Sequence, residues 1–152
     1  MKKRLLVFCF ALLTVAAFAQ TPIAPGPVNG TWDLAGSPYQ ITGDIEVQAA
    51  DALTIEAGVT VEFQGYYSFA IIGQLDIAGT VANNVTITAT DTNAGWKGLR
   101  FQNSVAVSTI DYANIEYGKA SGTSPDSRGG GLYASGTDDL TITNSTFSNC
   151  SA

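Results

Sequence analysis

Histidine is absent from the 152 residues of this chain, and cysteine and positive charge are scarce. Without histidine the chain lacks the commonest general base and the commonest metal ligand, so histidine-dependent serine triads, zinc sites and sugar chemistry are excluded within it. Its two cysteines are Cys9 and Cys150. Because Cys9 lies in the segment we interpret below as a cleaved leader, Cys150 has no partner for an internal disulfide. We therefore expect the core, and not disulfides, to hold the fold together.

The N-terminal segment, residues 1–19, is typical of a secretory signal peptide. Residues 2–4 are basic, residues 5–15 form an apolar run, and Ala-Phe-Ala at 17–19 is a small-x-small cleavage signal before Gln20. The alternative is an N-terminal membrane anchor, but the apolar run is short for a bilayer. We expect an exported protein, secreted or on a bacterial cell surface, with no membrane insertion after the leader is removed.

Positive charge almost disappears with the leader. Four cations remain, Lys97, Arg100, Lys119 and Arg128, against thirteen Asp and Glu residues, which gives a net charge of −9. This balance excludes a basic patch for nucleic acid and makes an anionic membrane surface an unsuitable partner. A divalent cation remains open as a cofactor.

Apolar residues alternate with Thr and Glu from Leu53 to Phe63, and Gly58 interrupts the stretch. The pattern predicts two short strands around a turn, with one face buried and one exposed. Leu53-Thr-Ile55 recurs further along the chain as Leu75-Asp-Ile77. No helical periodicity of useful length follows residue 20.

Further copies of these patterns continue toward the C-terminus. The segment 98–101 matches 131–134, and 58–61 finds an echo in 79–81. The segment 110–117 matches 140–147, which aligns Ile110 with Leu140 and would place Asn114 and Asn144 at equivalent turns.

These tandem repeats predict an all-β parallel solenoid of about four coils, because each coil can bury its inner face only by stacking on the next. We expect residues 20–30 to be a Pro/Gly-rich lead-in, residues 31–152 to form the domain, and residues 31–47 to supply capping strands. A β-sandwich is the alternative, disfavoured by the near-tandem repeats and by the lack of Asn-Gly hairpin turns between matched strands. The expected inner ladder is Leu53, Val61, Leu75, Val85, Leu99, Ile110, Leu132, Leu140 and Phe147.

Five segments carry a family likeness: LTIEAGVTVEFQG from Leu53, GQLDIAGT from Gly73, GWKGLRF from Gly95, STIDYANIEYG from Ser108 and GGGLYASGTDDLTITNSTFSN from Gly129. Over about residues 40–152 the chain resembles the bacterial right-handed parallel β-helix proteins of the pectin-lyase-like superfamily, of the secreted or surface type. The resemblance implies a right-handed, three-faced coil with an Asn ladder. It also implies more coils than are present here, so we expect the domain to be truncated at its C-terminus.

The resemblance leaves the activity open, because members range from polysaccharide lyases and hydrolases to adhesins. A lyase would use carboxylates to hold calcium and Arg or Lys as the base. Asp111 and Glu116, with Arg100 and Lys119 nearby in the sequence, and Asp138-Asp139 are the candidates. Ordinary exposed charges explain the same residues, and the histidine and Arg-Lys motifs of the hydrolases are missing. We assign no catalytic residue.

Aromatic side chains offer a different kind of site. Tyr66, Tyr67 and Trp96 could form a surface platform that stacks on sugar rings. The alternative is that they are core or coil-stacking residues.

Two loop segments could supply calcium ligands. These are Asp91-Thr-Asn93 and Asp138-Asp139, but neither has the spacing of a calcium loop, and such residues usually form turns. The glycine run 129–131 lacks the Lys and the helix of a nucleotide site and reads as a loop entering a strand.

The repeats account for nearly all of the sequence. We therefore expect a non-catalytic structural or adhesive module, with polysaccharide or cell-surface components as partners. The alternative is a polysaccharide lyase or glycoside hydrolase acting on acidic polysaccharide, with its site largely in missing coils.

Overall fold

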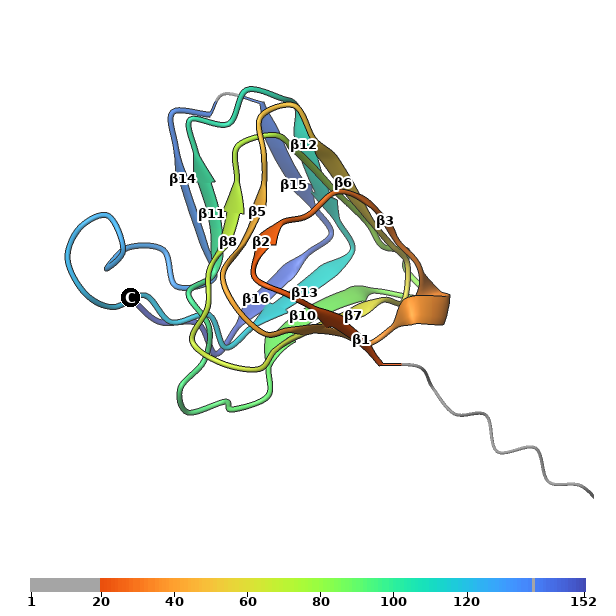
Figure 1. Ribbon diagram of the computed structural model, residues 1–152, viewed down its shortest axis with the longest axis horizontal. Coiled ribbons are helices and arrows are strands. Elements are labelled where there is room, and N and C mark those ends of the chain that lie inside the picture. Colours follow the sequence, from red (N-terminus) through yellow and green to blue (C-terminus); the bar gives the residue numbers. More distant parts are fainter. Residues whose placement is uncertain (1–19, 138) are drawn as a thin grey trace, which may run out of the picture.

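The computed structural model describes residues 20–137 and 139–152, in which the strands stack into three parallel sheets (Figure 1). Each coil gives one strand to each sheet in turn, so strand numbers within a sheet advance by three. As the chain passes from β1 to β2 to β3 it turns clockwise while receding from the viewer, the right-handed sense that parallel crossovers prefer. The described residues form a right-handed parallel β-helix of about five coils.

The three sheets are named A, B and C in the order in which the chain visits them. Sheet A contains β1 (Thr21–Ile23), β4 (Tyr39–Ile41), β7 (Thr60–Phe63), β10 (Val85–Ala89), β13 (Ala113–Glu116) and β16 (Thr146–Ser148). Sheet B contains β2 (Gly26–Pro27), β5 (Ile45–Val47), β8 (Phe69–Ile71), β11 (Leu99–Gln102) and β14 (Leu132–Ser135). Sheet C contains β3 (Gly30–Trp32), β6 (Ala52–Glu56), β9 (Gln74–Ala78), β12 (Ser108–Asp111) and β15 (Leu140–Thr143).

The expected pair of strands around Gly58 is confirmed. β6 and β7 flank this glycine, whose φ of 80° is the left-handed conformation that a residue without Cβ adopts easily. Leu53 and Ile55 pair with Leu75 and Ile77, as the repeated pattern predicts.

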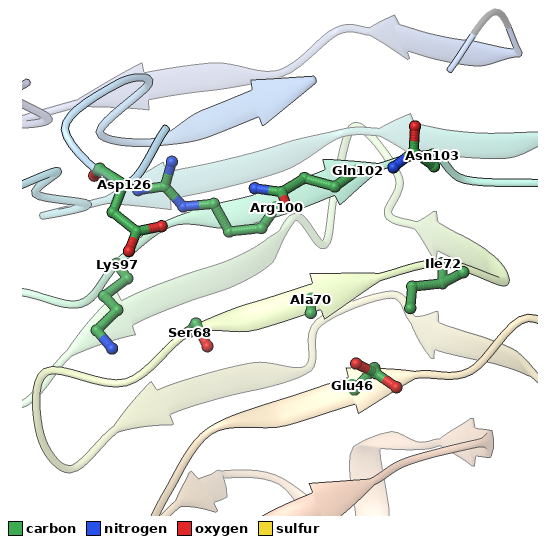
Figure 2. Close-up of a pocket in the computed structure, with 9 residues that line it drawn as sticks. All are labelled: Glu46, Ser68, Ala70, Ile72, Lys97, Arg100, Gln102, Asn103 and Asp126. Carbon is green, nitrogen blue, oxygen red and sulfur yellow. Dashed lines mark hydrogen bonds between the residues drawn. The ribbon is translucent and has the colours of Figure 1, made fainter. Parts of the chain in front are cut away.

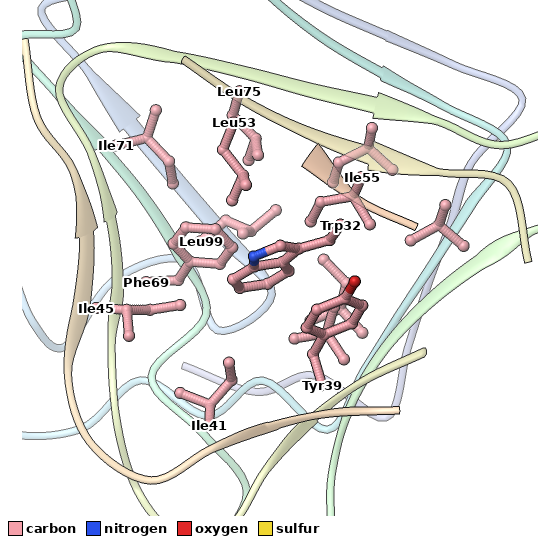
Figure 3. Close-up of a cluster of buried hydrophobic side chains, with 14 of the residues drawn as sticks. Trp32, Tyr39, Ile41, Ile45, Leu53, Ile55, Phe69, Ile71, Leu75 and Leu99 are labelled. Atoms are coloured by element: carbon pink, nitrogen blue, oxygen red, sulfur yellow. The ribbon is translucent and has the colours of Figure 1, made fainter. Parts of the chain in front are cut away.

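The core is a column of apolar side chains enclosed by the three sheets (Figure 3). Strand alternation sends every second residue inward, so the inner positions of β5 to β12 are almost entirely Ile, Leu, Val and Phe. At the N-terminal end the Trp32 ring stacks on Tyr39, with ring centroids 4.8 Å apart. The Tyr39 hydroxyl accepts a hydrogen bond from the Asp33 amide at 2.9 Å, and this fixes the short 3-10 turn η1 (Leu34–Gly36) beside it.

The segment 20–30, expected to be a lead-in, belongs to the stack. β1 pairs with β4 and β2 pairs with β5, so the first coil starts at Thr21 and the coil count is about five instead of four. The prolines of this segment are compatible with strands, because an edge strand tolerates proline where its N–H would have no partner.

Two of the repeat alignments have the wrong register. Ile110 pairs with Ile142 and not with Leu140, so the expected alignment of these two strands is shifted by two positions. Asn114 consequently lies opposite Thr146 and not beside Asn144, and it accepts a hydrogen bond from Asn84 instead. Thr60 pairs with Thr86, so the segment 79–81 is a turn and not a copy of β7.

The expected inner ladder is correct for its first six members, which are fully buried. Leu132 and Leu140 are half-buried against the core, and Phe147 is 40% exposed. These three lie on β14, β15 and β16, the last strands of their sheets. Within the described residues no helix is long and apolar enough to cross a membrane.

Candidate binding groove on sheet B

One row of outward positions crosses sheet B from end to end. The register places Pro27, Glu46, Ala70, Arg100 and Tyr133 side by side on successive strands. Their strand neighbours point into the core, so these five face away from it. Because Ala70 is the smallest of the five, the surface is hollowed between Glu46 and Arg100.

Figure 2 shows this hollow, which has a volume of about 420 Å³. It is lined by Glu46, Ser68, Ala70, Ile72, Lys97, Arg100, Gln102, Asn103 and Asp126. A second, more open hollow of about 340 Å³ shares Glu46, Ser68 and Ala70 with it and reaches Pro27. Together they form one groove, the sheet B groove, across β2, β5, β8 and β11. Adjacent strands lie about 4.8 Å apart, so the groove runs roughly 14 Å along the axis of the β-helix.

The loop 117–131, which joins β13 to β14, forms one wall of the groove and is held by Arg100. The Arg100 guanidinium donates hydrogen bonds to the backbone oxygens of Arg128 and Asp126, and its carbon lies 5.8 Å from the centre of the Tyr133 ring. Burial lowers the pKa of Arg100, and the Asp126 carboxylate opposes that shift. Arginine remains charged at neutral pH in such a setting.

The charges around the groove nearly balance. Lys97 Nζ lies 3.8 Å from Asp44 Oδ1 and 5.6 Å from the centre of the Tyr66 ring. Lys97 and Arg100 therefore face Glu46 and Asp126 in the lining, with Asp44 at the rim. The lining thus contains both hydrogen-bond donors and acceptors, with charges of both signs.

Trp96, expected on a surface platform, is not on the surface. Its side chain is 0% exposed and stacks on Phe63 with ring centroids 4.3 Å apart. Its indole N–H donates to the Glu116 backbone oxygen at 2.7 Å. The side chain belongs to the core and cannot contact a glycan.

Tyr66 and Tyr67, the other two residues of the expected platform, are both half-buried. The Tyr66 hydroxyl donates to the Lys119 backbone oxygen at 2.7 Å and lies 2.6 Å from Ser121 Oγ, while Tyr67 packs partly against the core. Tyr66 is thereby a brace between the β7–β8 connection and the loop 117–131.

The acidic residues considered for a lyase site do not come together. Asp111 is on sheet C, Glu116 on sheet A and Arg100 on sheet B, so they occupy three faces of the molecule. Asp111 Oδ1 accepts hydrogen bonds from Asn144 at 2.8 Å and Thr143 at 2.7 Å. These bonds stabilise the ionised carboxylate and lower the pKa of Asp111.

Of the calcium candidates, Asp91 lies in a turn, and Asp139 lies in the connection just before β15. Asp91 Oδ1 accepts the amides of Asn93 at 2.9 Å and Ala94 at 3.2 Å, while Asp139 contributes a backbone oxygen to Ser108. Asp138 lies outside the described residues. Over the part of the chain that the structure describes, no three of His, Cys, Asp and Glu gather to hold a metal ion.

The groove residues were missed from the sequence, apart from Arg100. Glu46, Ala70 and Gln102 are ordinary outward residues of three strands, and only the register of sheet B brings them together. The signal that could have found them is the alignment of outward positions across matched coils.

Comparison of the chain with protein-family models, with curated proteins and with solved structures finds no match.

Proposed function

We propose that the chain is a secreted or cell-surface β-helix module that binds a polysaccharide in the sheet B groove and does not catalyse a reaction. The observation that carries this proposal is the groove itself, which crosses four parallel strands around the small residue Ala70. An open groove that runs along the axis suits a segment of an extended polymer better than a compact small molecule.

The lining favours a ligand rich in hydroxyl groups. Lys97, Gln102 and Asn103 offer donors, while Glu46 and Asp126 offer acceptors, and a sugar hydroxyl can do both. Glu46 and Gln102 lie on strands of sheet B, which hold them in place and so reduce the entropy lost on binding.

The charge argues for a neutral polysaccharide. Both guanidinium contacts of Arg100 are made to backbone oxygens, and Lys97 lies close to Asp44. Without its leader the chain has a net charge of −9 from four cations and thirteen acids, which repels a polyanion.

Filling the groove tests the proposal. Ala70→Trp places a large side chain in the hollow, and we expect at least tenfold weaker binding of the neutral polysaccharide that the wild-type chain retains best in affinity electrophoresis. The probes are galactomannan, xyloglucan and polygalacturonate. Ala78→Trp is the matched control, because Ala78 is an exposed outward residue of β9 on sheet C. Equal retention of both variants would contradict the proposal.

A second candidate is a polysaccharide lyase or glycoside hydrolase, favoured by one observation. Two carboxylates, Glu46 and Asp126, line the same groove as Arg100. Release of reducing ends or unsaturated uronates by the wild-type chain, abolished by Glu46→Gln or Asp126→Asn, would establish it. Retention of polysaccharide without product release supports the binding module instead.

A further inference from the structure

The first and the last described strands of the three sheets differ in their chemistry. Within the described residues the first strands are β1, β2 and β3, and the last are β14, β15 and β16. An edge strand normally presents every second N–H and C=O outward, and a further strand can pair with them. The hydrogen bonds of β1 and β2 show which of their residues face outward.

In β1, the residues on either side of Pro22 face the sheet. Thr21 N–H donates to the Pro38 oxygen at 3.0 Å, and the Ile23 oxygen accepts Thr42 N–H at 3.0 Å. Alternate residues of a parallel strand bond to opposite sides, so Pro22 faces the open edge. Proline has no N–H, so this strand offers no central donor there.

The same arrangement recurs in β2. Gly26 N–H donates to the Asp44 oxygen at 2.9 Å, and Val28 N–H donates to the Glu46 oxygen at 2.8 Å. The residue between them, Pro27, therefore faces the open edge, and both prolines are exposed. Each proline occupies the outward position of its strand, where it costs no hydrogen bond within the molecule.

We infer that Pro22 and Pro27 close the N-terminal end of the β-helix against strand addition by a second copy of the chain. The last described strands of a second copy, β14, β15 and β16, would otherwise fit it, because they contain neither proline nor a charged residue. Parallel stacking of one end on the other is a head-to-tail contact, which has no natural stop and builds filaments. β1 and β2, two of the three edge strands, each lack one outward N–H donor. This removes the hydrogen bonds on which such a stack depends.

The double variant Pro22→Gln/Pro27→Gln restores both donors. Glutamine suits both positions. Gln40 lies opposite Pro22 on β4, and Glu46, which is close to glutamine in shape, lies opposite Pro27 on β5. We expect at least tenfold tighter self-association of the full chain in sedimentation equilibrium. Pro25→Gln is the matched control, because Pro25 is an exposed proline between β1 and β2, and it should behave as the wild type.

Hydrogen exchange gives a second readout at the same positions. At low protein concentration the new amides at 22 and 27 should exchange rapidly, and at high concentration they should become protected. Unchanged association with a wild-type circular dichroism spectrum would overturn the inference. So would protection of the new amides at low concentration, because they would then face β4 and β5. If the double variant fails to fold, self-association and hydrogen exchange are measured on each single variant, with the same expected results.

Discussion

Trp96 joins its own coil to the coil before it and the coil after it through two interactions. Its ring is fully buried, it stacks on Phe63 of β7, and its N–H bonds to the Glu116 oxygen of β13. We expect Trp96→Ala to lower the free energy of unfolding by about 3–5 kcal/mol, the usual cost of removing a buried aromatic side chain. Urea unfolding followed by circular dichroism measures it. Tyr66→Ala should cost clearly less, and equal losses would contradict the burial of Trp96.

Ionisation of the Asp111 carboxyl should make the free energy of unfolding depend on pH. Its pKa in the folded chain lies below the ordinary 3.8, because Asn144 and Thr143 donate to the carboxylate. A lowered folded-state pKa stabilises the fold above the unfolded-state value, and this contribution is lost as pH falls through the folded pKa. The stability difference between wild type and Asp111→Ala should therefore be constant from pH 7 to 5 and shrink below about pH 4.

Titration of the Asp111 carboxyl by NMR provides the direct check. In Thr143→Val, which removes one donor, the pKa of Asp111 should lie between the wild-type and the ordinary values. A wild-type pKa of Asp111 at or above 3.8 would contradict the hydrogen bonds described.

At the scale of elements, the loop 117–131 depends on Arg100. The guanidinium is the side chain that ties this loop to β11, and Tyr66 braces its start through Lys119. We expect Arg100→Met to leave the sheets folded but to raise hydrogen exchange in residues 121–128 at least tenfold. Lys97→Met, a cation removed from the same groove without loop contacts of this kind, is the control. Equal exchange in both variants would show that Arg100 does not hold the loop.

The strands themselves could largely be predicted from sequence. Alternation in Leu53–Phe63 and Val85–Ala89 specifies which residues face inward, because the side-chain period of a strand is two. If two strands are paired two residues out of register, the same side chains still face inward, so alternation alone cannot detect the error. The repeated pattern therefore aligns Ile110 with Leu140, whereas Ile110 pairs with Ile142 in the structure.

The groove and the position of Trp96 could not be read from the same pattern. Trp96 precedes β11 in a connection where Gly95 and Gly98 both adopt positive φ. The alternation of inward and outward residues in β11 therefore cannot be extended back to Trp96. The groove needs the register of sheet B, whose connections vary in length from coil to coil. The loop 117–131 is much longer than the connection between β4 and β5, and no local pattern predicts where it folds back.

At the scale of the whole molecule, each coil is paired only with the coils before and after it. All strand pairings join elements three apart in the chain, as in other solenoids. Stability is then approximately a sum over coils and their interfaces. Trp32→Ala in the first coil and Ile115→Ala in the fifth should therefore give additive losses in the free energy of unfolding, within about 0.5 kcal/mol. A double-mutant cycle measures the coupling, and a larger value would show cooperation across the stack.

The register of Thr60 with Thr86 sets the length of the central coil, so a coil that starts at residue 59 ends at residue 84. Duplicating the segment 59–84 would add one strand to each sheet and a second Ser68–Ala70 position to the sheet B groove. The groove would lengthen by about 4.8 Å, the spacing of one strand. The number of coils thus sets the length of ligand that the groove can hold, and a chain with one more coil should prefer a proportionately longer oligosaccharide.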